Sequence, residues 1–226
     1  MEAAALVVEE ALDRGARLVG VSGGVAVGKS TLAARVAAPL GAVAVAGDGF
    51  LHDNATLADR DLSARKGFPE SFDAPALQRF LDRWRTEGMA AAPIYSHLAY
   101  DVVGSATVTG ERLVLEGLHL GHPDLGVRDR LDLLVHLEAA DDDAARWYLQ
   151  RFQGLRAAAA QDPTAFLYPY REVPADAMDG MAMDVWRAVN LVVLEEAVRP
   201  WAHVADLVVV LGADHEAVDV RRPRGA

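Results

Sequence analysis

Residues 23–30 have the residue types and spacing of a loop that binds phosphate. They read Gly-Gly-Val-Ala-Val-Gly-Lys-Ser and match the pattern G-x-x-x-x-G-K-[ST], directly after a short apolar stretch. In this pattern, backbone N–H groups and the lysine ammonium hold the β- and γ-phosphates of a nucleotide, and the serine hydroxyl holds Mg²⁺. The predicted nucleotide site comprises Gly23, Gly24, Val25, Ala26, Val27, Gly28, Lys29, Ser30 and Thr31.

Two acidic side chains follow predicted strands and could contribute chemistry at the same place. Asp48 comes after the apolar stretch 42–46, and its flanking glycines would let a ligand approach closely. A carboxylate there could orient an acceptor hydroxyl and accept its proton, although an ordinary Asp-Gly turn explains the residue equally well. Glu116 ends the stretch 112–115 and either holds a magnesium-bound water or is a simple polar residue at a strand end.

Arg151 is a candidate for stabilising a transferred phosphoryl group. It lies on a helix predicted to begin at the three aspartates 141–143. An arginine in that place could close over the phosphoryl group during transfer. Arginines on exposed helices are commonly just solvated, so the sequence alone leaves both interpretations open.

Composition excludes several classes of function. The net charge of −11 and the pI near 5.0 argue against binding a polyanion such as DNA. There is no cysteine, and the seven histidines show no paired zinc spacing. No guanine-reading [NT]-K-x-D motif occurs, and its absence argues against GTPase function. The acidic N-terminus and the absence of a membrane-length apolar stretch indicate a cytoplasmic protein. We expect a small-molecule substrate as partner, no nucleic acid and no membrane, with a homodimer left open.

The order of apolar and amphipathic stretches predicts an α/β protein. Apolar strands without polar alternation, each followed by a helix, indicate a parallel sheet covered on both faces, with ligands at the carboxyl ends of its strands. We predict a P-loop NTPase fold with a mostly parallel five-stranded sheet flanked by helices, in a single domain over 1–226. The expected strands are 17–21, 42–46, 112–115, 131–137 and 205–211; the expected helices are 3–14, 29–40, 74–87, one from 141 and one over 174–198, with a loop at 93–101 and a polar tail at 221–226.

Several segments, in the same order, closely resemble bacterial type I pantothenate kinase, which belongs to the phosphoribulokinase and uridine kinase superfamily. The resemblance covers about residues 17–211 and is most specific in its first half. The segments that carry it are 25–31, 48–51, 65–73, 92–101 and 116–118, extended by Trp147-Tyr148, Arg151-Phe152, Asp162-Pro163, Trp186 and Asn190.

The resemblance implies ATP-dependent phosphorylation of the primary hydroxyl of pantothenate. By position, Lys29 and Ser30 would serve ATP and Mg²⁺, Asp48 would be the base, and Arg151 would stabilise the transferred phosphate. The family positions near the acceptor pocket are Tyr95, His97, Tyr148 and Asn190.

Departures from the family pattern, among them a short stretch at 118–130, keep alternatives open. Only 22 residues precede Gly23, and His119 stands where the family usually has asparagine. A related P-loop kinase that phosphorylates a nucleoside such as uridine, or a sugar, is one alternative. A nucleotide-binding or assembly protein without catalysis is another, although the presence of all the expected catalytic residues together argues against it.

Overall fold

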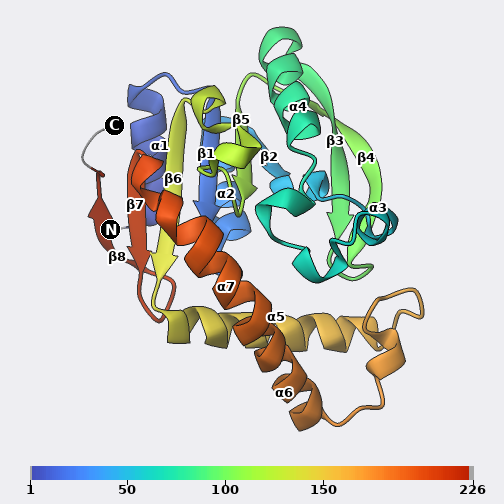
Figure 1. Cartoon of the computed structure of the whole chain (residues 1–226). Coiled ribbons are helices and arrows are strands. Elements are labelled where there is room, and N and C mark those ends of the chain that lie inside the picture. Colours follow the sequence, from blue (N-terminus) through green and yellow to red (C-terminus); the bar gives the residue numbers. More distant parts are fainter. Residues whose placement is uncertain (1, 224–226) are drawn as a thin grey trace.

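A six-stranded β-sheet runs through the centre of the protein, and the computed structural model describes residues 2–223. The strands of this sheet are β1 (Leu18–Gly23), β2 (Val43–Ala46), β5 (Leu113–Gly117), β6 (Leu133–Ala139), β7 (Leu207–Leu211) and β8 (Ala217–Arg221). Their spatial order is β2-β5-β1-β6-β7-β8 (Figure 1). The first five in this order are parallel, and β8 pairs antiparallel with β7. The predicted α/β class with a mostly parallel sheet is therefore confirmed.

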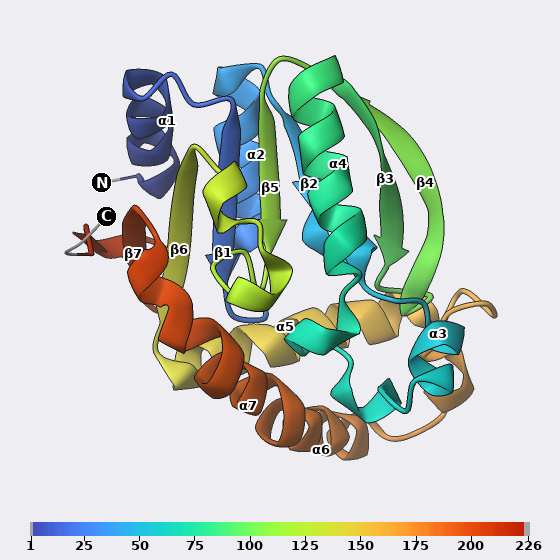
Figure 2. The same cartoon turned by 45° about the horizontal axis from the view of Figure 1, so that its top comes forward.

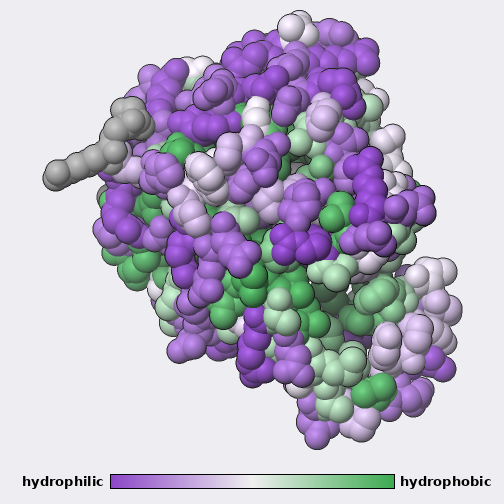
Figure 3. Space-filling model, viewed as in Figure 1, coloured by the Kyte–Doolittle hydropathy of each residue, from purple (hydrophilic) through white to green (hydrophobic). Residues whose placement is uncertain are grey.

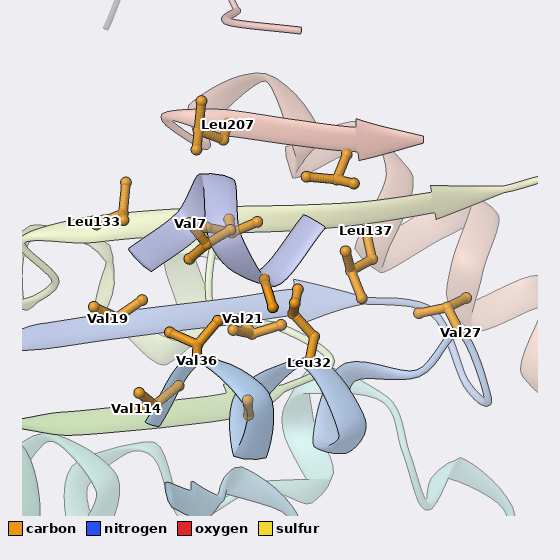
Figure 4. Packing of buried hydrophobic residues seen from close by; sticks show 14 of the residues in the cluster. Val7, Val19, Val21, Val27, Leu32, Val36, Val114, Leu133, Leu137 and Leu207 are labelled. Atoms are coloured by element: carbon orange, nitrogen blue, oxygen red, sulfur yellow. The ribbon is translucent and has the colours of Figure 1, made fainter. Parts of the chain in front are cut away.

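Helices cover both faces of the sheet, and α1, α2 and α4 each bury an apolar stripe against it. The helices are α1 (Ala3–Asp13), α2 (Lys29–Leu40), α3 (Asn54–Asp59), α4 (Ala74–Glu87), α5 (Asp141–Ala159), α6 (Ala175–Val185) and α7 (Leu191–Val193). Val7 of α1 and Val36 of α2 pack on Val19 and Val21 of β1 (Figure 4). On the opposite face, Leu77 and the other apolar residues of α4 join a second buried cluster.

The predicted helix over 174–198 forms as one nearly continuous helical run. It begins with α6, passes through a π-helical turn at Trp186–Asn190 into α7, and ends with a second π-helical turn at Leu194–Val198. Single π-helical turns inside helices occur frequently at functional sites. None of the helices within residues 2–223 is long and apolar enough to cross a membrane.

Two elements correct the sequence-based prediction. The stretch 93–101 is not simply a loop, because residues 93–96 belong to β3 (Met89–Ser96), which pairs antiparallel with β4 (Asp101–Thr109). The sheet has six strands rather than five, because β8 adds to the edge and extends into the predicted polar tail. Three consecutive alanines and a proline weaken the strand signal in β3, and β8 is short and largely exposed.

The carboxyl ends of the parallel strands all face α5, which crosses beneath them (Figure 2). The segments that follow β1, β2 and β5 therefore meet at one edge of the sheet, as expected for ligand sites in parallel α/β proteins. The hairpin of β3 and β4 lies beyond β2 at one side of this edge (Figure 1).

Candidate active site

The predicted phosphate-binding loop connects β1 directly to α2. Gly23 and Gly28 adopt positive φ angles of 146° and 91°, and a Cβ at Gly23 would lie 2.7 Å from the Leu137 carbonyl oxygen. Ala26 also adopts a left-handed φ of 63° although it is not glycine. Such a conformation costs about 1–2 kcal/mol, so the surrounding fold must hold this turn in place.

Lys29, Ser30 and Glu116 form the charged centre of the loop. The Lys29 ammonium donates a hydrogen bond to the Gly24 carbonyl oxygen at 2.7 Å. Ser30 Oγ donates to Glu116 Oε1 at 2.9 Å, and Glu116 is only 7% exposed. Desolvation lowers the pKa of Lys29 and raises that of Glu116, while the attraction between the two charges opposes both shifts. The half-buried Lys29 and two hard oxygen atoms, Ser30 Oγ of α2 and Glu116 Oε1 of β5, therefore belong to one loop region.

Asp48 lies in a 3₁₀ turn, Gly47–Phe50, that directly follows β2. A Cβ at Gly49 would lie 2.2 Å from the Pro93 carbonyl oxygen, and one at Gly47 would lie 2.8 Å from the Glu116 carbonyl oxygen. The two glycines thus allow close packing of backbone on β3 and β5, a role the sequence had not suggested. This packing fixes the position of the Asp48 carboxylate near the end of the sheet.

Arg151, His97 and Asp48 meet although they lie on three different elements. His97 Nε2 lies 2.7 Å from Arg151 Nη2 and 3.9 Å from Asp48 Oδ2. A guanidinium can only donate, so His97 Nε2 accepts and its ring proton must be on Nδ1. Desolvation and the charge of Arg151 lower the pKa of His97, while Asp48 opposes the shift. His97 is consequently neutral and cannot itself act as a proton donor through Nε2.

The remaining predicted residues form two aromatic groups beside this cluster. Tyr95 stacks edge-to-face with His97 at a centroid distance of 5.1 Å. The ring centroids of Tyr148 and Trp186 lie 5.4 Å apart, and the side chain of Asn190 lies near the Tyr148 hydroxyl. The structure therefore divides the predicted acceptor residues between the β3 side and the α5–α7 side.

The surface of the molecule is hollowed near the loop that follows α5. On the face shown in Figure 3, apolar residues gather around a depression between the α6–α7 run and the loop 160–174, below the segment 51–72. The exposed rings of Phe166 and Tyr100 pair at 4.9 Å near this loop. A small molecule entering here would meet apolar walls with polar groups at their ends, which is typical of ligand sites.

Lys66 is a site residue that sequence reasoning did not assign. Its ammonium donates to the Tyr100 carbonyl oxygen at 2.6 Å and to Asn54 Oδ1 at 2.7 Å. It also lies 4.0 Å from the centre of the Tyr100 ring and 5.1 Å from that of Tyr95. Two signals were available in the sequence: Lys66 and Lys29 are the only lysines of the chain, and Lys66 lies in the segment 65–73 that carries the family resemblance.

Comparisons with known proteins agree with this geometry. The sequence pattern of the phosphoribulokinase/uridine kinase family matches residues 18–160. A pantothenate kinase from Streptomyces avermitilis is 40% identical over 219 residues, covering 88% of this chain and 67% of the relative. Another from Clavibacter michiganensis subsp. michiganensis is 39% identical over 221 residues, covering 90% and 69% respectively. The structure of phosphoribulokinase from Rhodobacter spheroides shares the fold, with a TM-score of 0.57 and 15% identity over 94% of this chain and 82% of that one.

Proposed function

This chain belongs to the phosphoribulokinase/uridine kinase family, and we propose that it transfers the γ-phosphoryl group of ATP to the primary hydroxyl of pantothenate. The observation that carries this proposal is the meeting of Asp48 and Arg151 at His97, beside the phosphate-binding loop. The identity of about 40% to pantothenate kinases, over most of the chain, supports the choice of acceptor.

In the proposed reaction, a new bond forms between the acceptor oxygen and the γ-phosphorus while the bond from that phosphorus to the β–γ bridging oxygen breaks. The acceptor proton passes to the Asp48 carboxylate, and ADP leaves with the electron pair of the broken bond. Lys29 neutralises charge on the β- and γ-phosphates. Arg151 would leave His97 and donate to the phosphoryl oxygens as charge spreads over them during transfer.

The residues present suit Mg²⁺ carried by the nucleotide. The Ser30 hydroxyl and the Glu116 carboxylate lie 2.9 Å apart and offer the hard oxygen ligands that this ion prefers. Ser30 would coordinate the ion directly, and Glu116 would hold one of its water molecules. When bound, the ion neutralises phosphate charge and aligns the β- and γ-phosphates.

The acceptor would bind between the two aromatic groups. In this proposal, Tyr95 and His97 contact the acceptor from the β3 side, and Tyr148 and Asn190 contact it from the helical side. We infer that these groups orient the acceptor chain so that its hydroxyl points at Asp48. The same proposal treats residues 1–226 as one kinase domain that acts in the cytoplasm on a small molecule, alone or as a homodimer.

A panel of acceptors tests the proposal. Purified protein is incubated with γ-labelled ATP, Mg²⁺ and, separately, pantothenate, uridine, ribulose 5-phosphate and simple sugars. We expect label on pantothenate, with no transfer by the matched Lys29→Ala variant. Label only on uridine or a sugar would replace pantothenate as the acceptor while keeping the kinase chemistry. ATP consumption that no added alcohol stimulates would contradict phosphoryl transfer to an acceptor altogether.

A further inference from the structure

His119 joins two segments that are distant in the sequence. It lies just beyond the end of β5 and is only 1% exposed. Its Nε2 is 2.7 Å from the Gly67 carbonyl oxygen, and its Nδ1 is 3.3 Å from the Ala197 carbonyl oxygen. Burial lowers the pKa of His119 to about 4, so the ring carries a single N–H near neutral pH. The shorter contact places that proton on Nε2, and His119 therefore donates to Gly67.

The Gly67 contact anchors a tight turn formed by residues 66–72. Gly67 adopts a positive φ of 97°, and its N–H donates to Ser71 Oγ at 3.0 Å. Ser71 Oγ in turn donates to the Phe68 carbonyl oxygen at 2.6 Å. The Phe68 side chain packs with Val193 of α7 and with Val198. The turn is therefore rigid in itself, and His119 ties it to the strand end that carries Glu116.

The neighbouring residue, Lys66, connects this turn to the acceptor side of the site. Its ammonium holds the Tyr100 carbonyl oxygen and lies over the rings of Tyr95 and Tyr100. Tyr95 packs against His97, which reaches Arg151 and Asp48. Contacts thus run without a gap from His119 to the groups around the proposed acceptor hydroxyl.

We propose that His119 is a positioning residue for acceptor binding: its bond to Gly67 keeps Lys66, and through it Tyr95 and His97, in place against the nucleotide side. This role rests on the proposed kinase function. The phosphate-binding loop has its own local support, including the Lys29 bond to Gly24. Loss of the His119 bond should therefore disturb the acceptor side and spare nucleotide binding.

Kinetic comparison of substitutions at position 119 tests this role. His119→Leu and His119→Met fill the space without a donor and leave the Gly67 carbonyl unsatisfied, whereas the amide of His119→Gln can still donate to it. We expect a loss of roughly tenfold to a hundredfold in kcat/KM for the acceptor in the two apolar variants. The Kd for the nucleotide should stay within about twofold of the wild-type value. His119→Gln should recover most of the lost kcat/KM for the acceptor. His122→Leu is the matched control, because His122 lies 6.0 Å from the His119 ring and is not part of the 66–72 turn.

Amide hydrogen exchange supplies a readout that does not depend on any reaction. In the apolar variants, amides of residues 66–72 should exchange faster, while those of β1 and the phosphate-binding loop should not change. If no acceptor in the panel is phosphorylated, the proposed function fails while the exchange result still tests the anchoring of the turn. Unchanged exchange in the turn, unchanged acceptor kcat/KM, or an equal loss of nucleotide affinity would each overturn the role of His119.

Discussion

Replacing the buried His136 by leucine should remove part of the acid sensitivity of the folded protein. His136 lies on β6 between Ser22 of β1 and Val208 of β7, and it is 3% exposed. Burial, with smaller contributions from Lys29 and Arg221, lowers the pKa of His136 from 6.5 to about 4. The unfolded chain therefore binds this proton more tightly than the folded protein. The stability contributed by neutral His136 is complete above about pH 6.5 and decreases as the pH falls towards 4.

Proton linkage gives the size of the effect. At about pH 7.5, position 136 is neutral in both states and contributes almost nothing to the pH dependence. At about pH 5, the unfolded chain is protonated there and the folded protein is not, which lowers the free energy of unfolding by about 2 kcal/mol. Leucine has a similar volume and does not titrate. Between these two pH values, His136→Leu should therefore lose about 2 kcal/mol less stability than the wild type.

Urea unfolding followed by tryptophan fluorescence measures this difference, since the chain has four tryptophans. Both proteins are unfolded at the two pH values, and the slopes are compared to confirm that the exposed surface is unchanged. The exposed His203→Leu serves as the control and should follow the wild type. If His136→Leu loses as much stability on acidification as the wild type, His136 is not held neutral by burial.

Three further predictions concern the site. Asp48→Asn should lower kcat by roughly 10²–10⁴ with little change in ATP affinity, measured by steady-state kinetics and nucleotide titration; a small effect on kcat would make Asp48 only a turn residue. Arg151→Ala should lower kcat more than it raises the KM for ATP, because its charge is needed most during transfer; the reverse pattern would make it a ground-state binder. Gly49→Ala would place a Cβ 2.2 Å from the Pro93 carbonyl oxygen. Thermal unfolding should show that the free energy of unfolding falls by about 1–3 kcal/mol, and kcat should fall as well. Unchanged stability in that variant would mean that the turn can move away from β3 at little cost.

The nucleotide side of the site could be predicted from the sequence because its chemistry is local. The glycines, Lys29 and Ser30 lie within eight consecutive positions between one strand and one helix, and this spacing alone predicts which groups would face a phosphate. Asp48 and Glu116 could be placed at the same edge for a related reason. Parallel strands bring their carboxyl ends together whatever their order in the sheet.

The apolar pattern of the sequence explains why the five parallel strands could be predicted and why β3 and β8 could not. Buried strands such as β1 and β5 are continuously apolar, so the sequence marks them clearly. The alanines of β3 and the half-exposed residues of β8 have no such pattern, and these strands form because a partner strand satisfies their backbone groups.

Contacts between distant segments were decided only by the tertiary structure. Arg151 reaches His97 across 54 positions, and His119 reaches Gly67 and Ala197 across 52 and 78. No spacing rule connects such residues, because their distance depends on how α5 and the α6–α7 run pack beneath the sheet. The sequence by itself thus determined the chemistry proposed for the nucleotide side. Packing of helices and loops determined which side chains complete the acceptor side, because those contacts exist only once the apolar faces are buried.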